Sequence, residues 1–199
     1  DMQKITNKEI AARMQVSPPA VTEMIKRMKS ENLILKDKEN GYLLTDIGLK
    51  LVSELYRKHR LIEVFLVHHL DYTSDQIHEE AEVLEHTVSD LFVKRLDKLL
   101  GFPQTCPHGG TIPAEGELLV EINNLPLAAV QEAGTYLLTR VHDSFELLKY
   151  LEKHAIHIGD QVHVKQFDGF SNSFTLVNKD EDLQVSMDIA KQLYVEKIN

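Results

Sequence analysis

The sequence predicts a mainly α-helical protein with a smaller β portion, divided into three modules. Apolar residues recur with the 3.6-residue period of amphipathic helices through most of the first 100 residues. From about residue 125 onward, segments with the alternation of short strands are separated by Gly, Asn and Asp. A chain of 199 residues that is 43% hydrophobic is long enough to bury a core in several small domains.

The first module is predicted to contain two helices joined by a turn. "TNKEIAARM" offers Thr6 or Asn7 as the N-cap of a short helix, and Ser17 caps a second helix after the break at "QVSPP". Prolines occupy the first turn of the second helix, where a missing N–H costs nothing. The residues expected to face the core are Ile10, Ala11, Met14, Val21, Met24, Ile25 and Met28.

A β-hairpin is predicted next, because Asn40-Gly41 lies between two short apolar segments in "LILKDKENGYLLT". Two helices and a hairpin in this order predict a winged helix-turn-helix. Residues 1–60 contain 12 Lys and Arg against 8 Asp and Glu, whereas the remainder contains 10 against 23, so the net charge of −9 conceals a basic first module.

We therefore expect the first module to bind double-stranded DNA, with a small helical domain that has no ligand as the alternative. Hydroxyl groups and lysines on the exposed face of the second helix suit phosphate and base-edge contacts. Lysines of the hairpin would lie on the wing. The residues expected at DNA are Ser17, Pro18, Pro19, Thr22, Lys26, Lys36 and Lys38.

A long helix is predicted from Thr45 or Asp46 through Leu70, with an apolar stripe of Val52, Leu55, His59, Ile62 and Leu66. A lone histidine in such a stripe is more often a satisfied core residue than a metal ligand. Glu63, one helical turn after His59, gives it a metal-binding neighbour. A second helix is predicted from about Ser74 to Leu100, with a core stripe of Ile77, Ala81, Leu84, Val88 and Leu91.

The second helix contains "HEEAEVLEH", residues 78–86, in which six of nine side chains can hold a proton or a metal ion. At about 100° per residue, His78, Glu82, Glu85 and His86 share an arc of roughly 100°. The arc lies beside the apolar stripe. A cation is therefore a candidate ligand for this face.

The sequence "CPHGG" places Cys106 and His108 two residues apart in a tight turn, where both can bind one ion. The alternative is an ordinary half-buried cysteine beside a surface histidine. The single cysteine excludes an internal disulfide and fits a reducing compartment. Because we find no signal peptide and no apolar run of about 20 residues, we expect a cytoplasmic protein.

The last module is predicted to be a small β-barrel. "GDQVHVKQF", "SNSFTLVN" and "DLQVSM" have the pattern of short strands, and "DSFELLKYLEKH" that of one helix. "EINNLPL" is predicted to be a short linker before this module.

Three motifs, "SPPAVTEMIKRM", "YRKHRLIEVFL" and "HEEAEVLEH", resemble in order and spacing the diphtheria-toxin-repressor family of metal-activated transcription regulators. The resemblance continues through "GGTIP" into the tail, and the Glu-rich form is most similar to the manganese-responsive repressors of streptococci. It implies a winged helix-turn-helix DNA-binding domain at 1–53, a dimerisation and metal-binding domain at 54–122, and an SH3-like, FeoA-like domain at 123–199.

The resemblance also implies a repressor of metal-uptake genes that binds a palindromic operator as a homodimer. Mn(II) is the expected corepressor, with Fe(II) as the alternative, and Zn(II) or Cd(II) is expected to occupy the sites in vitro. A first metal site is expected at Glu82, Glu85 and His86, completed by a leading helix that family members have before the first helix found here. The second site is expected at Glu63, Cys106, His108, Asp143 and His59, with His78 as an additional candidate.

Two other classes of protein fit parts of the pattern. Carboxylate-bridged di-iron oxidases and ferritins also hold metal with Glu and His, but from four helices, whereas two candidate helices are found here. The sequence has no Gly-rich phosphate loop and no nucleophile elbow, so we do not expect an enzyme. A winged-helix regulator that ignores metals is the second alternative. Metal-dependent operator binding distinguishes the three.

Overall fold

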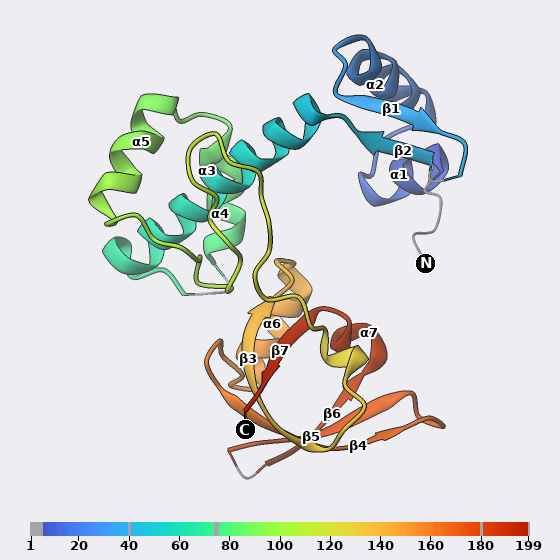
Figure 1. Cartoon of the computed structure of the whole chain (residues 1–199), viewed down its shortest axis with the longest axis vertical. Coiled ribbons are helices and arrows are strands. Elements are labelled where there is room, and N and C mark those ends of the chain that lie inside the picture. Colours follow the sequence, from blue (N-terminus) through green and yellow to red (C-terminus); the bar gives the residue numbers. More distant parts are fainter. Residues whose placement is uncertain (1–5, 40, 74–75, 180, 199) are drawn as a thin grey trace. The chain divides into compact units, whose positions relative to one another are not determined.

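The computed structural model describes residues 6–39, 41–73, 76–179 and 181–198. The chain divides into two compact units, which are described separately below. One unit contains residues 1–55 and 114–119, and the other contains residues 56–113 and 120–199. Figure 1 shows the elements in chain order.

The first unit contains the predicted helix-turn-helix and hairpin, formed by α1 (Asn7–Arg13), α2 (Pro18–Ser30), β1 (Ile34–Asp37) and β2 (Gly41–Leu44). Thr6 caps α1 in a capping box with Glu9, and Ser17 Oγ accepts a hydrogen bond from the N–H of Ala20 at the start of α2. β1 and β2 pair antiparallel, with Ile34 opposite Leu44. The predicted turn residue Asn40 lies outside the described residues.

A small core holds this unit together. Its buried residues are Ala11, Val21, Ile25 and Ile34, and Ile10, Met28, Leu33 and Tyr42 pack against them. Met24 is half-buried, whereas Met14, also predicted to face the core, is 53% exposed. Met14 is instead the C-cap of α1, where the chain turns away from the helix.

One long helix, α3 (Asp46–Leu70), follows the hairpin as predicted. Thr45 Oγ1 accepts a hydrogen bond from the N–H of Gly48 at 3.1 Å and so caps the helix. The buried apolar residues of α3 lie in its second half and include Leu61, Ile62 and Leu66. Leu55, predicted to face the core, is 41% exposed.

The predicted single helix from Ser74 to Leu100 is wrong, because the chain forms two helices, α4 (Ile77–Glu85) and α5 (Asp90–Leu99). α4 ends with His86 as its C-cap, and Ser89 starts α5 by accepting the N–H of Phe92. The break changes which residues face the core: Val93 and Leu96 are buried, whereas Leu91 is 66% exposed. Ser74 lies outside the described residues.

α3, α4 and α5 share the core of the helical part of the second unit, which also contains Cys106 and Ile112. A buried ion pair between Arg57 and Asp97, at 2.7 Å, joins α3 to α5. No helix of the described residues combines the length and the apolar character that a membrane span requires.

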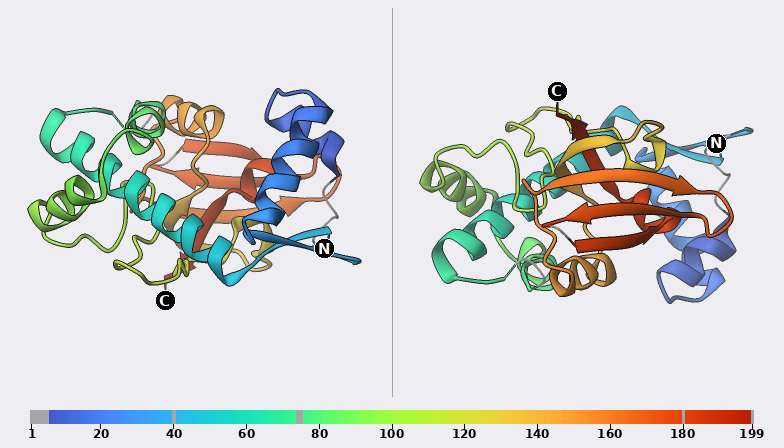
Figure 2. Two further views of the ribbon diagram at one scale, coloured as in Figure 1. Left: turned by 90° about the horizontal axis from the view of Figure 1, so that it is seen from above. Right: turned by 90° about the horizontal axis from the view of Figure 1, so that it is seen from below.

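The remainder of the second unit is built on a five-stranded antiparallel sheet in the order β6-β5-β4-β3-β7. Figure 2 shows these strands side by side. Its elements are η1 (Leu127–Ala129), β3 (Gly134–Val141), α6 (Phe145–Lys153), β4 (Gln161–Asp168), β5 (Ser173–Asn178), β6 (Glu181–Ser186), α7 (Met187–Ala190) and β7 (Leu193–Lys197).

The predicted helix and three predicted strands are present as α6, β4, β5 and β6, whereas β3 and β7 were not predicted. The prediction that "EINNLPL" is only a linker is wrong. Leu127 is fully buried in the core of this domain, and the carbonyl of Leu125 accepts a hydrogen bond from the N–H of Val195 in β7.

Candidate metal centre

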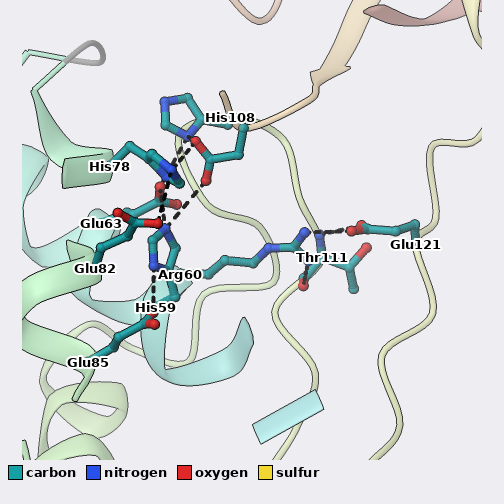
Figure 3. Close-up of polar contacts among 10 residues, drawn as sticks. His59, Arg60, Glu63, His78, Glu82, Glu85, His108, Thr111 and Glu121 are labelled. Atoms are coloured by element: carbon teal, nitrogen blue, oxygen red, sulfur yellow. Dashed lines mark hydrogen bonds and ion pairs between the residues drawn. The ribbon is translucent and has the colours of Figure 1, made fainter. Parts of the chain in front are cut away.

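Four segments of the second unit bring a cluster of ionisable side chains together. α3 contributes His59 and Glu63 on adjacent turns, and α4 contributes His78. The turn after α5 contributes Cys106 and His108, and Asp143 follows the end of β3, just before α6. Figure 3 shows the His and Glu side chains of α3, α4 and the turn directed toward one another.

The ligand atoms lie close enough to share a metal ion. His59 Nε2 is 3.2 Å from Glu63 Oε1 and 3.4 Å from Asp143 Oδ2. His108 Nδ1 is 3.2 Å from Glu63 Oε1 and 3.4 Å from Asp143 Oδ1, and His78 Nδ1 is 2.9 Å from that same Asp143 atom. The two carboxylates are therefore the centre of the cluster, with three imidazoles around them.

Backbone hydrogen bonds fix the turn that carries Cys106 and His108. The N–H of Gly109 donates to Cys106 O at 2.9 Å, and the N–H of Cys106 donates to Gly110 O at 2.9 Å. The N–H of Val141 in β3 donates to His108 O at 3.0 Å, which ties the turn to the strand that leads to Asp143. Cys106 and His108 are both buried, so the alternative of a surface histidine beside the cysteine is not what the structure shows.

Two of the histidines hold their protons tightly. Burial alone would lower the pKa of His59, but its contacts with Asp143 and Glu63 and their charges raise it to about 10. Burial opposes protonation of His108 as well, and the same two carboxylates raise its pKa to about 10. In the metal-free protein, imidazolium groups therefore balance the buried carboxylates.

The other members of the cluster respond to the same charges. Burial favours the neutral form of Asp143, yet its contacts with His108, His59 and His78 hold its pKa well below the usual range. Contact with Asp143 raises the pKa of His78. Burial, with the charge of Glu63, raises the pKa of the Cys106 thiol, which favours the protonated thiol.

These residues fit a metal ion. Glu63 is fully buried, and its Oε2 atom has no hydrogen-bond partner in the described part of the chain. A buried carboxylate oxygen without a donor is costly unless a cation binds it. The side chains form two overlapping groups of candidate ligands. Within each group the ligand atoms all lie within 4.8 Å of one another, and both groups include Glu63. They are His59, Glu63, His78 and Asp143, and Glu63, Cys106 and His108.

The three residues expected at a first metal site are not equivalent. The side chains of Glu82 and His86 are 64% and 72% exposed, whereas that of Glu85 is 8% exposed. Glu85 Oε1 is 3.4 Å from His86 Nε2, and Glu85 Oε2 is 2.7 Å from His59 Nδ1. Glu85 therefore contacts His59 of the cluster around Glu63 (Figure 3) as well as His86, the next residue in the sequence.

Arg60 forms a brace that local sequence patterns do not predict. The guanidinium of Arg60 donates to Thr111 O and to Glu121 Oε1, and Glu121 Oε2 accepts the N–H of Thr111 at 2.9 Å (Figure 3). Burial favours the neutral form of Glu121, but the hydrogen bond from the N–H of Thr111, followed by the bond and charge of Arg60, lowers its pKa. Arg60 directly follows His59 in the sequence. The helical phase of the apolar stripe of α3 could therefore have indicated that the Arg60 side chain lies beside this stripe.

In the first unit, all the residues expected at DNA are exposed. On α2, Lys26 Nζ is 2.7 Å from Glu23 Oε1, and Thr22 Oγ1 donates to Pro18 O. Lys36 lies on β1, and Lys38 follows it. The exposed face of α2 thus offers a cation and hydroxyl groups to solvent.

Three protein-family models match the chain. They are "Iron dependent repressor, N-terminal DNA binding domain" at residues 1–42, "Iron dependent repressor, metal binding and dimerisation domain" at 45–114, and "FeoA domain" at 125–197. Asp143 thus comes from the FeoA, SH3-like domain, and the other members of the cluster come from the metal-binding and dimerisation domain.

Known proteins resemble the chain over nearly its whole length. The manganese-activated repressor ScaR in its apo form is 62% identical with a TM-score of 0.95, over 99% of this chain and 94% of that one. The manganese regulator SloR is 57% identical with a TM-score of 0.91, over 98% and 91%. The diphtheria toxin repressor of Corynebacterium diphtheriae is 27% identical over 95% of this chain and 87% of that protein.

The similarity to ScaR and SloR and the matches to both repressor domains agree with the fold and with the buried cluster. The relatives are transcriptional regulators rather than enzymes, which removes the di-iron oxidase alternative. The chain belongs to the diphtheria toxin repressor family, and it is a metal-dependent, DNA-binding transcriptional repressor.

Proposed function

We propose that the chain represses metal-uptake genes in the cytoplasm, with Mn(II) as corepressor. The observation that carries this proposal is the cluster of His59, Glu63, His108 and Asp143, with Cys106 beside it. Carboxylates and imidazoles predominate in it, as they do in sites that use Mn(II) or Fe(II). The first site, at Glu82, Glu85 and His86, is part of the same proposal.

Which metal ion occupies the site in the cell depends on the availability of each ion as well as on the ligands. A thiolate beside imidazoles and carboxylates binds Zn(II) and Cd(II) at least as tightly as Mn(II). ScaR has been crystallised with bound Cd²⁺ and with bound Zn²⁺, although it is described as manganese-activated. We therefore propose Mn(II) as the physiological corepressor, Fe(II) as the alternative, and Zn(II) or Cd(II) as ions that occupy the cluster in vitro.

Binding of a cation to the cluster would release protons from its histidines and its cysteine. His59 and His108 must each release a proton to become ligands, and the Cys106 thiol must ionise. Contacts with three histidines lower the pKa of Asp143 and so keep it available as a carboxylate ligand. A bound cation would supply the positive charge that imidazolium groups supply in its absence.

α3 offers a route from the cluster to the DNA-binding domain, because this single helix starts at Asp46, directly after the hairpin, and carries His59 and Glu63. We propose that cation binding selects the conformation of the homodimer in which two copies of α2 fit two half-sites of a palindromic operator. In that complex Ser17, Pro19 and Thr22 select bases, and Lys26, Lys36 and Lys38 contact phosphates.

The experiment that tests this function selects DNA duplexes from a random library with the chain and Mn(II), and then measures their affinity by fluorescence anisotropy. Affinity should fall at least tenfold when a chelator replaces Mn(II), and Glu63→Gln should remove the difference. Glu146→Gln, on the exposed face of α6, is the matched control and should respond as the wild type does. Equal affinity of the wild type with Mn(II) and with chelator would exclude a metal-dependent repressor.

A further inference from the structure

The imidazole of His59 has a carboxylate on each side. Its Nδ1 atom is 2.7 Å from Glu85 Oε2, and its Nε2 atom is 3.2 Å from Glu63 Oε1 and 3.4 Å from Asp143 Oδ2. Glu85 lies on α4, whereas Glu63 lies on α3, so one ring joins two helices. His59 is therefore a physical link between the residues assigned to the two metal sites.

Glu85 is buried, whereas its neighbours Glu82 and His86 are exposed. Glu82 and His86, which are expected to share a cation with Glu85, expose most of their side chains to solvent, whereas the Glu85 side chain is 8% exposed. A carboxylate is buried at a cost unless it accepts strong hydrogen bonds. The short contact with His59 offsets that cost, and so the position of Glu85 is explained by His59 rather than by the exposed residues of α4.

Hydrogen bonding at one ring nitrogen decides what the other can do. When Nδ1–H of His59 donates to Glu85, the lone pair of the neutral ring is at Nε2, which is the nitrogen that faces Glu63 and Asp143. A carboxylate behind a histidine fixes its tautomer and its orientation and makes it a stronger base toward a metal. Loss of such a partner typically lowers metal affinity about 10- to 100-fold.

We propose that Glu85 is a positioning residue for the Glu63–Cys106–His108–Asp143 site, acting through His59, in addition to its place in the first site. The inference rests on the proposed function, because it assumes that the cluster around Glu63 holds a cation. Glu85 Oε2 is engaged by His59, and Glu85 Oε1 faces His86. The pair His59–Glu85 thus belongs to both sites and makes their occupancies interdependent.

The test uses Co(II) as a spectroscopic probe, because absorption from a cobalt–thiolate bond reports only the site that contains Cys106, the only cysteine of the chain. Titration of this band gives the affinity of that site without any measurement of DNA binding. Glu85→Gln should weaken Co(II) binding about 10- to 100-fold. The matched control Glu79→Gln, an exposed glutamate of α4 that is assigned to neither site, should change it less than twofold.

A double-mutant cycle shows whether Glu85 acts through His59. In a His59→Ala background, Glu85→Gln should have little further effect on the thiolate band, because the ring that carries the influence is gone. An undiminished loss in that background overturns the inference, as does a Glu85→Gln effect no larger than that of Glu79→Gln. A wild-type chain that shows no cobalt–thiolate band contradicts the proposed function itself, and the inference falls with it.

A measurement on the wild type alone covers the case in which Glu85→Gln does not fold. In the Zn(II)-loaded protein, ¹⁵N NMR of the histidine rings should show His59 protonated at Nδ1 and bound to the metal at Nε2. A ring that is bound through Nδ1, or that carries its proton at Nε2, would contradict the proposed geometry.

Discussion

At the scale of single residues, the cluster binds protons where a cation is expected to bind. His59 and His108 have their pKa values raised from 6.5 to about 10, so the folded chain binds these protons more tightly than the unfolded chain does. The stabilisation is complete below about pH 6.5 and is lost as the pH rises toward about 10. Its source is the pair of carboxylates, Glu63 and Asp143.

We predict that the metal-free chain melts at a progressively lower temperature as the pH is raised from 6.5 to 10. Differential scanning calorimetry in the presence of a chelator measures the effect. His59→Gln should flatten the profile, whereas His68→Gln, at an exposed position of α3, should leave it unchanged. A wild-type melting temperature that is constant over this range would show that the buried histidines are neutral.

Some of these residues could be predicted from the sequence, and the reasons differ. The separation of His59 and Glu63 by one helical turn, and the turn "CPHGG", place pairs of candidate ligands by local geometry alone. Asp143 was assigned only through the family resemblance. The contacts of Glu85 with His59 and of Arg60 with Glu121 depend on how helices and loops far apart in the sequence pack, and no local pattern contains that information.

At the scale of elements, the turn between Cys106 and Gly110 packs tightly against β3 at Gly109 and against the Arg60 side chain at Gly110. Gly109 has a φ of +78°, and a Cβ atom there would lie 2.0 Å from Thr139 O of β3. A Cβ atom at Gly110 would lie 2.6 Å from the Arg60 guanidinium carbon. The first obstacle is backbone, whereas the second is the end of a side chain, which can shift if its hydrogen bonds to Thr111 and Glu121 loosen.

We therefore predict that Gly109→Ala lowers the free energy of unfolding more than Gly110→Ala does. The backbone strain at Gly109 is worth about 1–3 kcal/mol, and the clash with β3 adds to it. Urea denaturation of the metal-free variants measures both changes. Gly116→Ala is the control for positive φ without a clash, since it has a φ of +81° and no neighbour within 4 Å. Equal losses at Gly109 and Gly110 would contradict the argument.

The exposed face of α2 gives a prediction for DNA. The ion pair of Lys26 with Glu23 is solvated on both sides and contributes little to stability, so Lys26 can turn to a phosphate. Lys26→Ala should weaken binding to all duplexes and reduce the slope of log affinity against log salt by about 1. Lys191→Ala, which removes a similar exposed pair with Asp188 in α7, should leave the slope unchanged. An unchanged slope for Lys26→Ala would place DNA recognition elsewhere.

The elements that the sequence failed to predict have physical causes. The helical period continues through residues 86–89, and only the caps at His86 and Ser89 reveal that α4 and α5 are separate. β3 lacks clean alternation, because Arg140 is buried between the carbonyl of Asn123 and the ring of Tyr194. β7 is five residues long, too short for a pattern.

At the scale of the whole molecule, α5 exposes an apolar face. Leu91, Phe92 and Leu99 are 66%, 45% and 62% exposed and share an arc of roughly 100° on the helix. These residues lie within the match to the dimerisation domain. Leu99→Glu should raise the dimer dissociation constant at least tenfold, about 1.4 kcal/mol, as measured by sedimentation equilibrium. The control is Val120→Glu, which adds the same charge at a similarly exposed apolar position. A Leu99→Glu variant that remains fully dimeric would exclude this face of α5 as the dimer interface.

Linkage between metal and DNA is the central claim for the whole molecule, and it is measured most directly as an Mn(II) binding isotherm with and without the selected operator duplex. Thermodynamic reciprocity requires the duplex to raise the affinity for Mn(II) by the same factor by which Mn(II) raises the affinity for the duplex. We predict a shared factor of at least tenfold, which Glu63→Gln abolishes. Superimposable isotherms with and without the duplex would contradict the account.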